Sequence, residues 1–317
     1  MTPNMRLQGE HSMTRLLVSL HKVIWLIAFL SFWMTSSIGA AEPEFDATSL
    51  QPKGVALKWL GVAGWEIRTG SSIVLIDPFL TRKDRFLDTE WKTDEGAVLK
   101  VINGANYIFA GHSHIDHIGD IPFIAKRFVS KVIGSRTTTN IALTAGVDKS
   151  QLITIQGGEK FDFKDFSVQV IESQHGVLKR SGQRRQPKSA EILKPWSGPI
   201  MGNAFVEGGS YLYLFTFGKH RVLHQSTGNF IGENLEGLQP DVAILAENST
   251  YEWATALKIL RPKLVIVHHF DDWRAPLSYG ISRSNIKRAE RLEQEVKSVD
   301  REIKVIIPQL LTTYTLD

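Results

Sequence analysis

Residues 111–120, GHSHIDHIGD, concentrate three histidines and two aspartates in ten positions. The run YIFA, expected to be a buried strand, leads directly into this segment, so its polar side chains leave the end of a strand. His112 and His114 then point the same way, because alternate residues of an extended chain share a face. We predict that these two histidines bind one divalent ion. Asp116 and His117, after the chain turns, face a second ion.

The alternative for this segment is a solvated loop, because Asp, Ser, Gly and His are all common in turns. That alternative would be favoured for an isolated pair of histidines, but not for the spacing HxHxDH directly after a strand. The chain has no cysteine, so any metal site must use histidine and carboxylate ligands. The sequence therefore predicts a metal centre.

The N-terminal segment is typical of a secretory signal. Within residues 1–41, basic residues precede the uncharged run VIWLIAFLSFWM, and small residues follow it. We predict a signal peptide cut near Ala40 or Ala41, a secreted or periplasmic protein, and a folded domain at 42–317. The alternative is an uncleaved membrane anchor, because the uncharged stretch is close to the roughly 20 residues that span a bilayer.

Charge and composition limit the partners. Without residues 1–41 the chain keeps 34 Lys and Arg against 32 Asp and Glu, so its net charge is only +2. This balance does not favour nucleic-acid binding. Because no cysteine is available for lipid attachment, we expect membrane contact only through an uncleaved N-terminal segment. The 317 residues, 43% of them hydrophobic, can bury a large core.

Strands and helices alternate in two rounds. Asp120 is expected to cap a helix whose apolar positions recur at helical spacing. In the second round, alternating aromatic residues around Gly218 and Lys219 predict a hairpin. A helix is expected over Tyr251–Leu260, before Pro262. The remaining predicted strands lie at 55–60, 65–69, 71–80, 131–135, 152–156, 161–173, 241–247, 263–267, 302–307 and 310–316, with further helices at 137–146 and 285–299. Two β-rich halves predict two sheets packed face to face between helical layers.

The spacing of the histidine segment resembles the signature of the metallo-β-lactamase superfamily. The segments KWLGVAGWEIRT and IVLIDPFL resemble the opening strands of the branch that includes ascorbate-phosphate lactonases and the N-acyl-phosphatidylethanolamine phospholipase D group. The resemblance implies a four-layer αββα sandwich and a metal-dependent hydrolase domain over 42–317.

The same resemblance implies the remaining ligands. His175 would join His112 and His114 at the first metal. His269, followed by an aromatic residue, would join Asp116 and His117 at the second, and His268 would point away or support the site. The resemblance also identifies Asp77 as a residue that supports the ligands rather than binding the metal.

One position departs from the family pattern. Family members usually carry an aspartate that bridges both metals, and in RVLHQSTGNF this position is Ser226. Serine is a neutral, weak ligand, so the second metal is expected to be less secure than the first. His224 or Glu247 are candidates to compensate, although each is ordinarily a structural residue. Three histidines with water would still make a catalytic zinc site.

The implied chemistry is hydrolysis. Zn²⁺, as one or two ions and with Mn or Fe as alternatives, would lower the pKa of bound water from about 15.7 to near 7. That hydroxide would attack an ester, lactone, amide or phosphodiester, with Asp116 orienting it and carrying its proton. Because of Ser226, the alternative is a catalytically impaired binding protein of the envelope. A redox protein is a weaker third reading, because diiron members usually carry Glu where His114 stands.

A long basic loop follows His175. Six basic residues lie between Lys179 and Lys194, against the single acid Glu191. We expect a lid or substrate-binding edge in which Arg184 and Arg185 suit an anionic group of a small-molecule or lipid-derived substrate, and Trp196 supplies an apolar surface. The alternative is a disordered, solvated loop.

Overall fold

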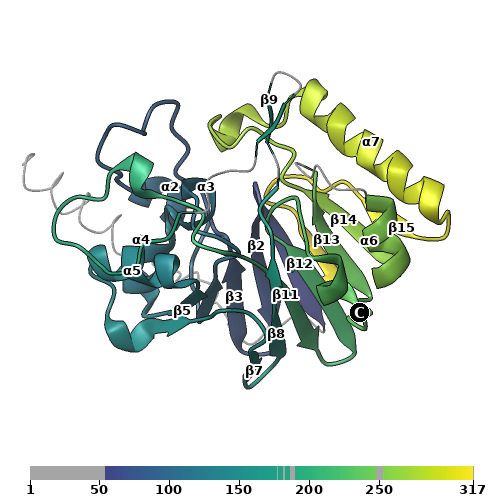
Figure 1. Ribbon diagram of the computed structural model, residues 1–317, viewed down its shortest axis with the longest axis horizontal. Coiled ribbons are helices and arrows are strands. Elements are labelled where there is room, and N and C mark those ends of the chain that lie inside the picture. Colours follow the sequence, from purple (N-terminus) through teal and green to yellow (C-terminus); the bar gives the residue numbers. More distant parts are fainter. Residues whose placement is uncertain (1–53, 177, 181–182, 186–189, 248–252, 317) are drawn as a thin grey trace, which may run out of the picture. The chain divides into compact units, whose positions relative to one another are not determined.

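The computed structural model describes residues 54–176, 178–180, 183–185, 190–247 and 253–316 (Figure 1). They belong to one compact unit, Gln51–Asp317. The expected signal peptide or anchor at 1–41 lies outside the described residues, so it stays a prediction. Within the described ranges, no helix is both long enough and apolar enough to cross a membrane.

The first sheet has seven strands in the order β16-β1-β2-β3-β4-β5-β6. Strands β16, β1, β2 and β3 pair antiparallel, and β3 to β6 pair parallel. The three predicted opening strands are therefore confirmed, but the third ends before Asp77, whose φ of 45° turns the chain out of the sheet. The strands are β1 (Val55–Gly61), β2 (Gly64–Thr69), β3 (Ser72–Ile76), β4 (Tyr107–Phe109), β5 (Lys131–Gly134), β6 (Leu152–Thr154) and β16 (Thr313–Leu316).

The second sheet also has seven strands, in the order β15-β14-β13-β12-β11-β8-β7. The predicted hairpin is confirmed as β11 and β12, and Gly218 adopts the positive φ of 56° that its tight turn requires. The strands are β7 (Lys160–Asp162), β8 (Ser167–Ser173), β11 (Ser210–Phe217), β12 (His220–Gln225), β13 (Val242–Ala246), β14 (Leu264–His268) and β15 (Lys304–Ile306). A separate ribbon pairs β9 (Leu178–Arg180) with β10 (Gln183–Arg185).

Helices cover the outer faces of the two sheets. In Figure 1, α4 and α5 lie beside the first sheet, and α6 and α7 lie beside the second. The helices are α2 (Glu95–Leu99), α3 (Ile115–Ile118), α4 (Ile121–Phe128), α5 (Arg136–Thr144), α6 (Trp253–Leu260) and α7 (Arg283–Val299). This arrangement confirms the predicted αββα sandwich, because each sheet buries one face against the other sheet and one against helices.

Aromatic side chains join the two sheets directly beneath the histidine segment. Phe109 of β4 packs edge-on against Tyr213 and Phe215 of β11, with ring centroids 5.2 and 5.1 Å apart. The Tyr213 hydroxyl donates to the carbonyl of Ala110 at 2.7 Å, so a buried polar group is satisfied where the first sheet ends. The strand end that carries the histidines is therefore fixed to the opposite sheet.

One predicted detail is wrong. Asp120 precedes α4 as expected, but its side chain makes no cap bond to that helix. Its Oδ2 instead accepts from the backbone N–H groups of Leu80 and Thr81 at 2.7 and 2.8 Å. The buried carboxylate thus holds the segment after β3 against the start of α4, a long-range contact that local helix patterns do not reveal.

Candidate metal centre

The histidine segment leaves β4 and turns into α3 within five residues. His114 is the N-cap of α3 in an extended conformation, so Asp116 and His117 fall on its first turn. Gly111 begins the segment because no side chain fits there: a Cβ would lie 2.1 Å from Cβ of Ser226. The turn therefore sends His112 and His114 in one direction and Asp116 and His117 in another.

The first group of converging ligand atoms is His112, His114 and His175. Each offers a ring nitrogen, and these atoms lie within 4.8 Å of one another. Nε2 of His112 is 3.0 Å from Nδ1 of His114, and the His175 ring lies 4.8 and 4.7 Å from the other two ring centroids. His175 follows β8, so this group draws ligands from both sheets.

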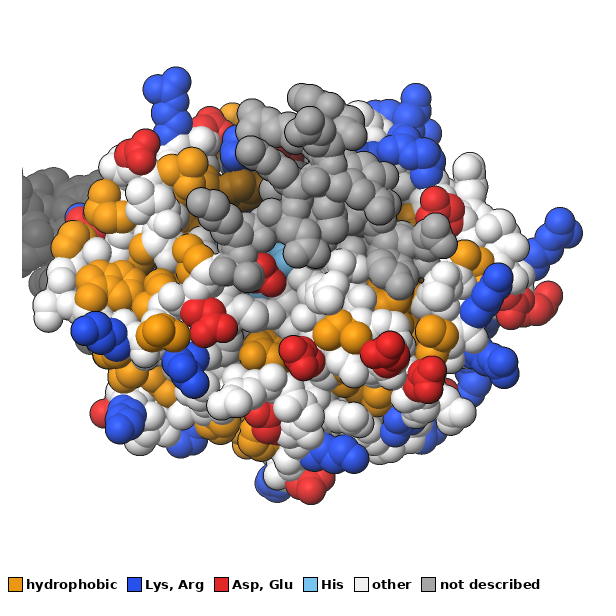
Figure 2. Space-filling model, in the orientation of Figure 1, with side chains coloured by type: hydrophobic (Ala, Val, Ile, Leu, Met, Phe, Trp, Pro, Cys, Tyr) orange, Lys and Arg blue, Asp and Glu red, His pale blue; other side chains and the backbone are white. Residues whose placement is uncertain are grey.

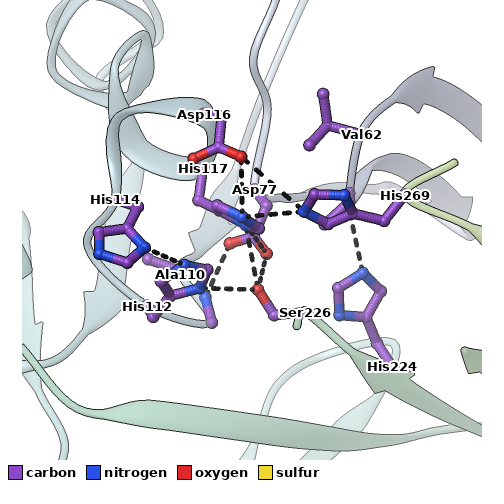
Figure 3. A network of polar contacts seen from close by, with 12 residues as sticks. Val62, Asp77, Ala110, His112, His114, Asp116, His117, His224, Ser226 and His269 are labelled. Carbon is purple, nitrogen blue, oxygen red and sulfur yellow. Dashed lines mark hydrogen bonds and ion pairs between the residues drawn. The ribbon is translucent and has the colours of Figure 1, made fainter. Parts of the chain in front are cut away.

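The second group is Asp116, His117 and His269 (Figure 3). Nε2 of His117 lies 3.5 Å from Oδ2 of Asp116 and 3.4 Å from Nε2 of His269. His269 follows β14 in a left-handed conformation, with φ 60°, and its N–H donates to the Val62 carbonyl at 2.9 Å. The second group also combines residues from both sheets.

Asp77 contacts His117 on the side of the ring away from Asp116 and His269. Its Oδ2 lies 3.0 Å from Nδ1 of His117, and its Oδ1 accepts from the N–H of Gly111 at 2.7 Å. This contact keeps the proton on Nδ1 of His117 and turns Nε2 toward Asp116 and His269. Asp77 is fully buried and belongs to neither group of converging ligand atoms, and its supporting role stays a prediction.

Ser226 occupies the outer side of the ligand rings. Its hydroxyl donates to Asp77, and it lies 3.1 Å from Nδ1 of His117 and 3.4 Å from Nδ1 of His112 (Figure 3). The nitrogens that face the other ligands are instead Nε2 of both rings. Ser226 thus orients ligands, and neither converging group includes it.

The two residues proposed to compensate for Ser226 have other partners. Nε2 of His224 donates to the Ala63 carbonyl at 2.9 Å, and Glu247 forms an ion pair with Arg288. His268 also turns away: its Nδ1 accepts from Nε1 of Trp65 at 3.0 Å, while its Nε2 donates to the Gln225 carbonyl at 2.7 Å. His269 is therefore the histidine of this pair that faces the site.

Burial keeps most of the clustered rings neutral. Burial lowers the pKa of His112 well below its ordinary value, with neighbouring histidines adding to the effect. The same main cause lowers the pKa of His114 and of His269 to about 4. Neutral imidazoles offer free lone pairs, which is the form that binds a metal ion.

His117 behaves in the opposite way. Burial alone would lower its pKa, but the carboxylates of Asp116 and Asp77 outweigh burial and raise that pKa to about 10. For Asp116, burial would raise the pKa, yet contact with His117 holds it well below its usual range. The second group therefore favours positive charge between these side chains, and a divalent cation would supply it. Both groups therefore fit a divalent metal ion.

The substrate residues expected from the basic loop are only partly described. Arg184 and Arg185 lie in β10, and their side chains lie outside the described residues. Trp196 is half-buried against the core between the first sheet and its helices, and its Nε1 donates to the Pro199 carbonyl at 3.3 Å. It does not line the cavity beside His175, so its role as a substrate surface stays a prediction.

The structure also contains site residues that the sequence analysis did not predict. Arg82 and Asp271 form a buried ion pair of 2.8 Å, and Oδ1 of Asp271 accepts from the N–H of Val62, which is bonded to His269. Glu207 lies in a cavity beside His175. The only local signal for Glu207 is the pair of glycines that follows it; the ion pair has none.

On the face shown in Figure 2, a small patch of histidine surface is visible beside an acidic side chain.

Comparisons with known proteins find similar chains. A β-lactamase superfamily domain matches residues 73–209. A curated relative from Myxococcus xanthus, described as a UPF0173 metal-dependent hydrolase, is 26% identical over 79% of this chain and 80% of its own length. A relative from Methanopyrus kandleri with the same description is 24% identical over 79% of this chain and 95% of its own.

Solved structures show the same fold. A metallo hydrolase from Ignicoccus hospitalis has a TM-score of 0.56 at 20% identity, covering 83% of this chain and 98% of its own. The isothiocyanate hydrolase from Delia radicum gut bacteria has a TM-score of 0.53 at 15% identity, covering 82% and 98%. The matched domain, the curated relatives described as metal-dependent hydrolases and the shared fold together support the assignment of this chain to the metallo-β-lactamase superfamily.

Proposed function

We propose that the protein hydrolyses an ester, lactone or phosphodiester with one or two Zn²⁺ ions, Mn or Fe being the alternatives. The observation that carries this proposal is the convergence of His112, His114 and His175, whose ring nitrogens lie within 4.8 Å of one another. Burial lowers the pKa of all three rings and keeps them neutral. Three neutral imidazoles on one ion leave a fourth position free for water or substrate.

When bound, such a cation polarises a carbonyl or phosphoryl oxygen and acidifies a water molecule. Asp116 supplies the complementary group: its carboxylate stays ionised because His117 holds its pKa low, and its side chain is 15% exposed. It can therefore orient the attacking water and accept a hydrogen bond from it. His117 is held by Asp77, so Asp116 meets a ring of fixed orientation.

We further propose that the first group binds its ion more tightly than the second. The second group has one carboxylate, Asp116, and Ser226 adds no negative charge to it. The carboxylate of Asp77 acts only through Nδ1 of His117. One ion per chain is therefore expected at limiting metal, and a second at higher concentration.

Metal analysis of the purified chain tests the proposal. The wild-type protein should copurify with at least one Zn, Mn or Fe per chain and cleave p-nitrophenyl acetate, bis(p-nitrophenyl) phosphate or a γ-lactone. His114→Ala should lose the metal and the activity together. His220→Ala is the matched control, because this histidine lies at the β11–β12 turn, away from both groups. A folded wild type that takes up no metal would overturn the proposal.

Ser226 supports a second candidate, a binding protein of the envelope with impaired catalysis. Ser226 occupies the position where the resemblance places a bridging aspartate, and its hydroxyl donates to Asp77. This candidate predicts a folded chain that hydrolyses none of the three probe classes even when loaded with metal. Turnover lost in His114→Ala but kept in His220→Ala would exclude it.

For location, we propose cleavage near Ala40 or Ala41 and a secreted or periplasmic domain at 42–317, with an uncleaved anchor as the alternative. The run VIWLIAFLSFWM supports this proposal. Mass spectrometry of the protein from the envelope fraction gives its N-terminus directly. A chain that still begins before residue 23 and stays with the membrane would indicate the anchor.

For the substrate, we propose a small or lipid-derived molecule, and the basic loop favours an anionic group on it. Neutralising Arg184 and Arg185 together should lower the catalytic efficiency on phosphodiesters more than on neutral esters. Equal efficiency in the variant and the wild type would remove the support for an anionic substrate.

A further inference from the structure

A polar cavity of about 410 Å³ opens beside His175. One wall is the end of β8, Glu172 to His175, and the second is the segment Glu207–Tyr211 that leads into β11. The third wall combines Arg136 at the start of α5 with the chain that follows β6. Its volume falls within the range of small-molecule sites, and one of its lining residues belongs to the first ligand group.

The second wall is bonded to the histidine segment itself. The Glu207 carbonyl accepts from the N–H of Ser113 at 2.8 Å, and the N–H of Tyr211 donates to the Gly111 carbonyl at 2.7 Å. Gly208 lets this wall approach α5, because a Cβ there would lie 2.2 Å from Cβ of Thr137. The cavity is therefore held at a fixed distance from His112 and His114.

The charge of the cavity is negative. Among the described residues that line it, Glu172, Glu191 and Glu207 are acidic and only Arg136 is basic. Burial raises the pKa of Tyr211 on this wall to about 12, and the nearby carboxylates of Glu159, Glu172 and Glu191 add to that effect.

Glu207 is the buried member of this set. Its exposed fraction is 8%, and its Oε1 accepts from the Ser210 hydroxyl at 3.0 Å. Within the described ranges, no side chain or backbone group donates to its Oε2. A carboxylate in this state has capacity for one more donor, and a charged donor is favoured because the site is partly withdrawn from water.

We propose that this cavity binds a cationic group of the substrate, a primary ammonium or a guanidinium, with Glu207 as its partner. The inference rests on the proposed hydrolase function and adds to it the chemistry of one substrate group. A cation seated here places the adjoining part of the molecule next to His175, at the edge of the first ligand group. The described walls thus favour a cationic substrate group, whereas Arg184 and Arg185 are expected to favour an anionic one.

Binding of simple amines tests the cavity separately from catalysis. Titration calorimetry on the full metal-loaded chain would compare n-pentylammonium with 1-pentanol and pentanoate, which match it in length. We expect n-pentylammonium to bind at least tenfold more tightly than either. Glu207→Gln should remove about tenfold of that affinity while leaving the metal content unchanged, because Glu207 is no metal ligand. Glu233→Gln, an exposed glutamate in η4 (Gly232–Leu235), is the matched control.

The outcomes separate the two proposals. Tighter binding of pentanoate, or an n-pentylammonium affinity that Glu207→Gln leaves unchanged, overturns the cavity assignment even if the enzyme hydrolyses its probes. Should Glu207→Gln fail to fold, Glu172→Gln at the exposed rim replaces it, with an expected loss of about threefold, and no loss overturns the assignment. Loss of metal binding and turnover with intact amine binding would instead contradict the hydrolase proposal alone.

Discussion

Oδ2 of Asp77 lies 3.0 Å from Nδ1 of His117, and this contact fixes the orientation of that ring within the second ligand group. Asp77 has this position because the chain leaves β3 with a φ of 45° at this residue. The backbone turn after the third strand therefore determines which nitrogen of His117 faces Asp116 and His269.

Asp77→Asn should weaken binding of the second metal ion. An amide supports the His117 ring less well than a carboxylate, and loss of such a partner typically costs 10–100-fold in metal affinity. We expect the second ion to be lost first on dialysis, with the first retained, as measured by elemental analysis. Asp88→Asn, at an exposed position, is the control. Equal retention of both ions in Asp77→Asn would show that the contact does not support metal binding.

Ser226→Asp should destabilise the metal-free protein. The new carboxylate would stand against Asp77, the group to which the serine hydroxyl now donates, and like charges in a buried site disfavour ionisation. In chelator, we expect urea denaturation to show a loss of about 1–3 kcal/mol in the free energy of unfolding. Added Zn²⁺ should recover part of that loss. A variant as stable as the wild type in chelator would contradict this reading.

Arg82→Met should cost about 3–5 kcal/mol in the free energy of unfolding, because it leaves Asp271 buried without its cation. The Asp271 carboxylate also accepts from the N–H of Val62, whose carbonyl accepts from the N–H of His269. Binding of the second metal ion should therefore weaken as well. Lys263→Met removes the cation of an exposed pair and should cost less than about 1 kcal/mol. Similar losses in the two variants, measured by urea denaturation, would contradict the prediction.

The metal-free protein should lose stability on acidification. Burial lowers the pKa of His224 to about 4, whereas in the unfolded chain it returns to about 6.5. Below pH 6.5 the unfolded chain takes up a proton that the folded chain refuses, so stability falls as the pH drops from 6.5 towards 4. The contribution of this one ring is about 3 kcal/mol.

His224→Gln isolates that contribution, since the other buried histidines remain. The difference in unfolding free energy between pH 7 and pH 4.5, measured in chelator, should be smaller in the variant. His220→Gln, on the same strand β12, should leave that difference as it is in the wild type.

The fold could be predicted from the sequence because its signals are local. Alternating aromatics and Gly218 fixed the β11–β12 hairpin, and the run YIFA placed the histidine segment at the end of β4. The grouping of His175 with His112 came only through the family resemblance, since nothing local links residues so far apart. Asp120 shows the limit: it stands where a helix cap is expected, yet it bonds to Leu80 and Thr81.

The cavity and the buried ion pair could not be predicted, because their members come from different elements. Glu207 and Glu172 meet only after β8 and β11 pair side by side. Arg82 and Asp271 are separated by most of the domain, and each alone resembles an ordinary surface charge. Long-range assembly, which residue spacing does not encode, creates both sites.

Both ligand groups take residues from each of the two sheets, His112 and Asp116 from one, His175 and His269 from the other. An ion in either group would therefore fasten the halves of the sandwich together. Because the ion binds the folded chain and not the separated sheets, its binding free energy adds to the stability of the sandwich, so resistance to proteolysis would rise with the metal supply of the surroundings.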